Sequence, residues 1–225
     1  MATPIREDLL DAHHAAWVSL TTPVSWWTGE QRLALAQCAV AAINDPAPVP
    51  PWVPVTSTDR FDGTDVVSAA ALDVTYRIAR HAGTMTADGA QAAMDELGAL
   101  AYVELCGVDK TVPAVVTFAR NAGVDVPPLP DPIDGAPTGQ RPTTVVDATL
   151  NWVPVAAPAD ERPAVVQAYT GVPIADEITW QLAAAQYIPG PEMGQPDWMR
   201  RPGGLTRPEA ELIAARIAQL RECFY

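Results

Sequence analysis

Cysteine, histidine and lysine are scarce in this 225-residue sequence: there are three cysteines, three histidines and one lysine. Cys38, Cys106 and Cys223 are odd in number and far apart, which argues against the disulfide framework of a small secreted domain. The cysteines and histidines do not cluster at metal-ligand spacing, so we expect neither a zinc nor an iron site and predict no cofactor. We attribute the single lysine, Lys110, to coding bias and not to function.

Long apolar runs and an excess of positive charge are also missing. No run approaches the roughly 18 to 20 residues that span a bilayer, and Met1–Asp11 contains charged residues where a signal peptide would be apolar. The net charge is -13, with Lys+Arg 14 against Asp+Glu 27, which gives no basic footprint for nucleic acid or an anionic membrane. We therefore expect a cytoplasmic protein without a membrane span and without a nucleic-acid partner.

Apolar residues make up 48% of the chain, and their spacing is helical in most segments, which predicts an all-α fold. Thr28 and Gln31 match a capping box, in which a Thr and a Gln three residues later satisfy each other's backbone amides. Pro113 predicts a break or kink because proline lacks the amide donor. The expected helices cover residues 5–20, 28–44, 64–82, 86–97, 99–122, 164–169, 175–187 and 206 to the end of the sequence.

Proline marks the expected boundaries between the parts of the chain. Residues 1–123 are predicted to form a bundle of four or five helices with an N-terminal arm. Residues 124–163 contain nine prolines and are predicted to be a linker packed on the surface. Residues 164–225 are predicted to hold the C-terminal helices.

The helix start at Thr206 resembles the one at Thr28, since each Thr is followed three residues later by Gln or Glu and then by an apolar run. Capping boxes are common, so this pattern alone leaves chance and an internal repeat equally open. Further along, Glu211–Tyr225 resembles the active-site segment of the alkylhydroperoxidase D-like (carboxymuconolactone decarboxylase) superfamily. In that family a Glu precedes a Cys-x-x-Cys by twelve residues and a His follows. Leu72–Val126 is similar to the helices that pack around that site.

The resemblance implies an alkylhydroperoxidase D-like helical bundle with long Pro-rich connecting segments, and a peroxidase-related thiol redox activity. Cys223 matches the first Cys of the motif and Glu211 matches the Glu. The sequence stops at Tyr225, one residue before the second Cys would fall, so the motif is expected to be degenerate or truncated. Aligning Thr28 with Thr206 puts Asp45 in the place of Cys223.

Four residues are the candidate catalytic groups. Cys223 would supply a thiolate, and Glu211 could supply a proton only if the helix breaks before Cys223, since twelve helical residues separate them by about 18 Å. His81 and Glu104 are further candidate acids. The alternative for His81 is a cation at a helix C-terminus, and the alternative for Glu104 is an ion pair with an arginine such as Arg77.

Two other readings of the function stay open. One is a non-catalytic helical subunit for assembly or for binding a larger partner. The other is a cofactor-free carboxymuconolactone decarboxylase-like enzyme, which would use His and Glu instead of thiols. Cys38 and Cys106 lie within apolar helical patterns and are expected to pack in the core. The resemblance also implies a homo-oligomer, with a protein redox partner or a larger complex as a further possibility.

Overall fold

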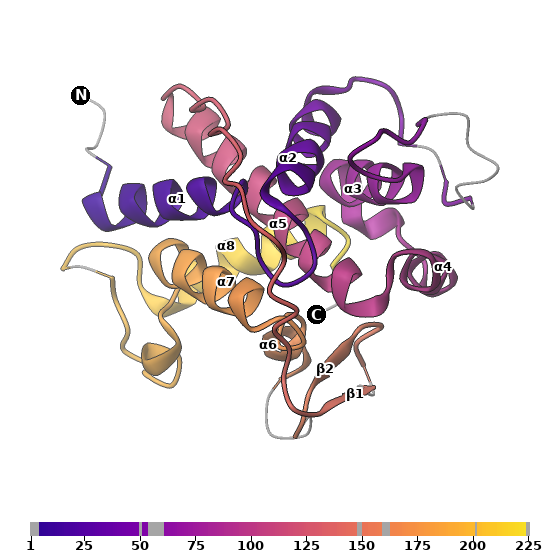
Figure 1. Ribbon diagram of the computed structural model, residues 1–225. Helices are drawn as coiled ribbons and strands as arrows, with labels where there is room; N and C mark the ends of the chain where they lie inside the picture. Colours follow the sequence, from indigo (N-terminus) through magenta and orange to yellow (C-terminus); the bar gives the residue numbers. More distant parts are fainter. Residues whose placement is uncertain are drawn as a thin grey trace.

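Eight α-helices and one small hairpin form the part of the chain that the computed structural model describes, which is residues 5–49, 51–53, 61–147, 150–158, 163–200 and 202–223 (Figure 1). The predicted all-α class is confirmed. None of the helices in those ranges is long and apolar enough to cross a membrane. The helices are α1 (Glu7–Ser19), α2 (Gly29–Asn44), α3 (Ala69–His81), α4 (Ala87–Leu97), α5 (Ala99–Ala122), α6 (Ala164–Gln167), α7 (Pro173–Gln186) and α8 (Arg207–Leu220), with short 3-10 turns at Ala82–Thr84 and Gly190–Glu192.

The long helix α5 is the centre of the packing. It contacts α2, α3 and α4, and it also contacts α1 and α7, which pack on each other (Figure 1). Leu105 and Val112 of α5 are fully buried, as are Leu35 of α2 and Val74 of α3. Burying such side chains contributes roughly 1.5 to 3 kcal/mol each, so the α2–α3–α5 layer is the main source of stability.

Local side-chain hydrogen bonds set the helix starts. Thr28 and Gln31 form the predicted capping box at α2, with N···O distances of 3.0 and 3.2 Å. The predicted start of α3 at residue 64 is wrong. The Thr64 hydroxyl accepts the backbone N–H groups of Val66 and Val67, a local turn that competes with helix, and α3 begins only after the Ser68 cap.

Pro113 does not interrupt its helix. α5 continues from Ala99 to Ala122, so of the predicted break or kink the break is wrong. Proline removes one hydrogen-bond donor, but the helix is packed by five neighbours and its valines around Pro113, including Val112 and Val116, are buried. Tertiary burial therefore outweighs the local cost.

The Pro-rich segment after α5 runs in extended conformation over α1 and the α1–α2 connection (Figure 1). Its backbone donates from Ile133 to the Thr21 carbonyl at 2.9 Å and from Thr138 to the Val24 carbonyl at 2.8 Å. It then forms an antiparallel pair of strands, β1 (Val145–Asp147) and β2 (Pro154–Ala156), which the sequence did not predict. Three-residue strands carry too little periodicity to be recognised.

Candidate functional site

Two of the four candidate catalytic residues are set by helix α8: Glu211 lies in its first half, and Cys223 lies in the turn just after its end. Its start at Thr206 is held by Glu209, whose carboxylate accepts the Thr206 backbone N–H at 2.8 Å. No side chain on α8 is buried. The helix therefore lies on the surface, unlike α2, whose sequence its start resembles.

Cys223 lies in a turn that ends α8. The Cys223 N–H donates to the Ala218 carbonyl at 2.9 Å and the Glu222 N–H donates to the Gln219 carbonyl at 3.2 Å, the hydrogen-bond pattern of a Schellman motif. Glu222 has φ 54°, the left-handed conformation that usually requires glycine. The thiol residue is exposed and follows directly on this strained position.

The same turn lies against the end of α3. A Cβ added to Gly83 would lie 2.9 Å from His81 Cε1, 3.0 Å from Glu222 Cβ and 3.1 Å from the Arg221 carbonyl oxygen. His81 and the residue before Cys223 thus lie around one glycine, although they are far apart in the sequence. His81 Nδ1 is buried and makes no hydrogen bond among the described residues. The structure therefore brings the residues that precede Cys223, namely Arg221 and Glu222, close to His81.

Glu211 is not part of this cluster. Its carboxylate accepts a hydrogen bond from the Tyr187 hydroxyl and one from Arg207 Nε at 2.6 Å. The Tyr187 hydrogen bond, followed by Arg207, lowers the pKa of Glu211 below its ordinary value. Although α8 does end before Cys223, the helix from Glu211 to Leu220 still extends about 14 Å. Glu211 is therefore an ionised carboxylate at the far end of α8 and not a proton donor beside Cys223.

No protein-family model, curated protein or solved structure matches this chain. The roles of the residues therefore have to be argued from the chain's own geometry.

Glu104 has a structural role that the sequence only half predicted. The carboxylate is fully buried and accepts hydrogen bonds from the Ser25 and Trp26 backbone amides at 3.0 and 2.8 Å. Its other oxygen binds Arg32 Nη1 at 2.8 Å. Burial raises the pKa of Glu104, while these three donors oppose the rise. The sequence predicted an ion pair between Glu104 and an arginine such as Arg77. The arginine is Arg32 instead, and Arg77 pairs with Asp73 on its own helix at 2.7 Å.

The other two cysteines are partly buried, Cys38 on α2 against Leu72 of α3 and Cys106 on α5 near Tyr169 and Val153. Burial, helped by the negative charges of Asp109 and Asp73, raises the pKa of the Cys38 thiol to about 12. Burial and Asp109 likewise raise the pKa of Cys106. A thiol with a raised pKa carries little thiolate at neutral pH, so both are poor nucleophiles. This agrees with the packing role expected for them.

Asp109 is a buried acid that the sequence analysis passed over. It is 1% exposed, and neither carboxylate oxygen makes a hydrogen bond of ordinary geometry within the described part of the chain. Burial raises the pKa of Asp109 well above its usual value, and the facing Thr75 only partly opposes this. The available signal was an acidic residue in an otherwise apolar helical run, the pattern that drew attention to Glu104.

Proposed function

We propose that this chain is a thiol redox protein of the kind that the resemblance to the alkylhydroperoxidase D-like family suggests, and that Cys223 is its reacting thiol. The supporting observation is the contrast among the three cysteines. Cys223 is exposed on a strained turn beside His81, whereas burial raises the pKa of Cys38 and of Cys106. Exposure and access are what a nucleophilic thiol needs.

The proposed step is the two-electron reduction of a hydroperoxide. The Cys223 thiolate attacks the terminal peroxide oxygen and the O–O bond breaks. The terminal OH stays on sulfur as a sulfenic acid, and the leaving alkoxide takes up one proton to become an alcohol. His81 is the proposed donor of that proton, since the turn that holds Cys223 packs around Gly83 with it. Glu211 and Glu104 take no direct part, because one lies at the other end of α8 and the other is enclosed in an ion pair.

A second thiol must then resolve the sulfenic acid. Cys38 and Cys106 belong to α2 and α5 and pack against the core, so the resolving thiol is proposed to come from another molecule, a small dithiol or a redox partner protein. It attacks the sulfenic sulfur, releases water and forms a mixed disulfide, which a further thiol reduces. Such a cycle fits the cytoplasm, where thiols stay reduced, and we place the protein there.

Trapping of the sulfenic acid tests this proposal. The reduced protein is mixed with hydrogen peroxide or tert-butyl hydroperoxide in the presence of dimedone, and the adducts are located by mass spectrometry. We expect the adduct at Cys223, none in Cys223→Ser, and an unchanged yield in the matched controls Cys38→Ser and Cys106→Ser. His81→Gln should slow adduct formation by roughly 10²-fold without moving it. A protein whose Cys223 stays unmodified, or whose Cys38 reacts first, would contradict the proposal.

A non-catalytic role in assembly is the second candidate, and one observation favours it. Ile213, Ile217 and Leu220 form an apolar stripe along α8 and are 47%, 57% and 59% exposed. When Thr206 is aligned with Thr28, the same positions of α2 hold Leu35, Ala39 and Ala42, all at 0% exposure. A face that is interior in α2 is thus uncovered in α8, which suits contact with another subunit.

Light scattering on the protein as it elutes from a size-exclusion column distinguishes the assembly role from the thiol redox role. If α8 is an assembly surface, Ile217→Glu should reduce the molar mass of the particle, and Arg216→Glu, on the neighbouring polar face, should not. Peroxide reactivity that survives in Ile217→Glu would show that the thiol chemistry is independent of assembly. If the wild-type protein is a monomer and Ile217→Glu does not change its molar mass, the assembly role is contradicted.

A further inference from the structure

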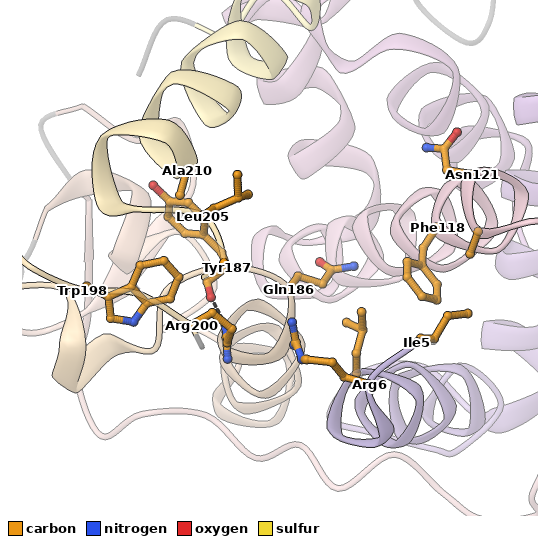
Figure 2. Close-up of a pocket in the computed structure, with 13 residues that line it drawn as sticks. Ile5, Arg6, Phe118, Asn121, Gln186, Tyr187, Trp198, Arg200, Leu205 and Ala210 are labelled. Carbon is orange, nitrogen blue, oxygen red and sulfur yellow. Dashed lines mark hydrogen bonds between the residues drawn. The ribbon is translucent and has the colours of Figure 1, made fainter. Parts of the chain in front are cut away.

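A cavity of about 550 Å³ lies between the start of α1, the last turns of α5 and α7, residues 198–200 and 204–205, and the first turn of α8 (Figure 2). This volume falls within the range of pockets that bind small molecules. Its lining includes Ile5, Arg6, Phe118, Trp198, Arg200 and Ala210.

The charge of this lining is opposite to that of the protein. The chain has almost twice as many acidic as basic residues, yet the described residues that line the cavity include two arginines and no carboxylate. Figure 2 shows the Arg6 and Arg200 side chains in the middle of the view, between Trp198 on one side and Phe118 on the other. The cavity is therefore a cationic site on an acidic protein, which concentrates anions there.

The two guanidinium groups are fixed by the same helix end. Arg6 Nη2 donates to the Ala185 carbonyl at 2.5 Å, and Arg200 Nη2 donates to the Ala184 carbonyl at 2.7 Å and to that of Tyr187. These carbonyls end α7 and have no partners within the helix. The arginines are thus held in place by groups that neutralise neither of them.

The neighbouring acids leave Arg200 available. Asp8 pairs with Arg6 at 2.9 Å, and its side chain is exposed. Glu192 accepts the Trp198 indole N–H at 2.5 Å, and Glu211 is held by Tyr187 and Arg207. Arg200 itself forms no salt bridge within the described part of the chain. Burial, and next the positive charge of Arg6, lower the pKa of Arg200, and the charges of Asp8 and Glu192 only partly oppose this, so an anion in direct contact with Arg200 would be stabilised.

Apolar and aromatic side chains form the rest of the wall. Trp198 is 7% exposed, and the Arg200 guanidinium lies 5.6 Å from its ring centroid. Phe118 stands across the cavity, next to Ile5 (Figure 2). Asn121 and Gln186 add neutral hydrogen-bonding groups. A ligand that fits this wall has one anionic end and an apolar body.

We infer that this cavity binds a small carboxylate with an aromatic or aliphatic body, whose carboxylate contacts Arg200 and whose body lies between Trp198 and Phe118. Arginine is suited to this because its planar N–H fork matches a carboxylate. The site is separate from the proposed thiol, since the helix from Ala210 to Leu220 alone extends about 15 Å. The inference therefore does not depend on the redox function.

Titration calorimetry with a matched pair of probes tests the inference. Naphthalene-2-carboxylate and its neutral amide have the same shape and differ in charge. We expect saturable binding of one carboxylate per chain, at least about tenfold tighter than the amide, and weakened by added salt. Equal affinities for the two probes, or no saturable binding of the carboxylate up to its solubility, would overturn the inference.

Variants locate the site. Arg200→Met should abolish the preference for the carboxylate over the amide, and Arg200→Lys should keep part of it. Ala210→Phe, which fills the cavity and leaves both arginines in place, should prevent binding of both probes. Arg216→Met removes a positive charge from the exposed part of α8 and should bind both probes like the wild type. If Ala210→Phe binds the probes as tightly as the wild type, the ligand binds elsewhere. This test can be made even if Arg200→Met fails to fold.

Discussion

Glu104 on α5 and Arg32 on α2 form a buried ion pair, with 2.8 Å between Arg32 Nη1 and Glu104 Oε1 and side-chain exposures of 0% and 5%. Arg32 also donates to the Ser19 carbonyl at the end of α1, while Glu104 accepts two amides of the α1–α2 connection. The pair therefore joins α5 to α2, to the end of α1 and to the α1–α2 connection, a region that lies far from α5 in the sequence.

Glu104→Gln should destabilise the protein by about 3 kcal/mol, because it leaves the Arg32 guanidinium buried without a counter-charge. Urea unfolding at pH 7 measures the change, with Glu96→Gln on the exposed face of α4 as the matched control. The double variant Arg32→Met/Glu104→Leu should be less destabilised than the sum of the two single changes. Strict additivity would mean that the two side chains do not interact energetically.

Asp109→Asn should raise the stability of the protein above that of the wild type by more at pH 8 than at pH 4. The unfolded chain loses the Asp109 proton near pH 4, whereas burial raises the pKa of the folded group well above that. Wild-type stability therefore falls as pH rises through this window, by about 1.4 kcal/mol for each pH unit, and the amide does not titrate. Urea unfolding between pH 4 and 8 measures this, and Asp125→Asn is the exposed control. Parallel curves for wild type and Asp109→Asn would contradict the expectation.

Lys110 should titrate with a pKa of about 8. Burial lowers the pKa of its ammonium group, opposed by Asp176, and Nζ donates to Thr179 Oγ1 at 2.8 Å. Because Lys110 is the only lysine, ¹³C-lysine labelling gives a single side-chain signal to follow by NMR. Thr179→Val should lower the midpoint further by removing an acceptor from the charged form. A midpoint near the ordinary value of about 10.4 would place the ammonium in water.

Glu222→Gly should strengthen the turn that holds Cys223. Glycine adopts the left-handed conformation at φ 54° without the cost of roughly 1 kcal/mol that a side chain incurs. Hydrogen exchange of the amides of residues 222 and 223, which donate to Gln219 and Ala218, should slow up to about fivefold. Glu222→Ala keeps the Cβ and serves as the control. Faster exchange in the glycine variant would mean that the Glu222 side chain stabilises the turn.

Gly83→Ala should disturb the contact between the end of α8 and His81. The added methyl group would lie within 3.1 Å of His81 Cε1, Glu222 Cβ and the Arg221 carbonyl oxygen, so one of these groups has to move. Alkylation of Cys223 by iodoacetamide, followed by mass spectrometry, should change in rate by severalfold, while Cys38 should remain protected. Gly190→Ala, which meets no neighbouring atom, is the control. An unchanged rate would show that this contact does not influence the thiol.

The sequence by itself determined the features that depend on neighbours in the chain. The α2 start follows from Thr28 and Gln31, which satisfy each other's amides within one helical turn. The all-α class follows from apolar spacing over whole helices. The packing role of Cys38 was predictable in the same way, because its surroundings are apolar along the helix.

Only the tertiary structure decided which distant residues meet. Arg32 and Arg77 are both arginines on helices that pack against α5, and nothing in their local sequence says that Glu104 pairs with the first. Pro113 looked like a helix breaker until the burial of α5 outweighed its missing donor. The cavity around Arg200 joins five segments from residue 5 to residue 210, so its cationic lining exists only once the chain has folded.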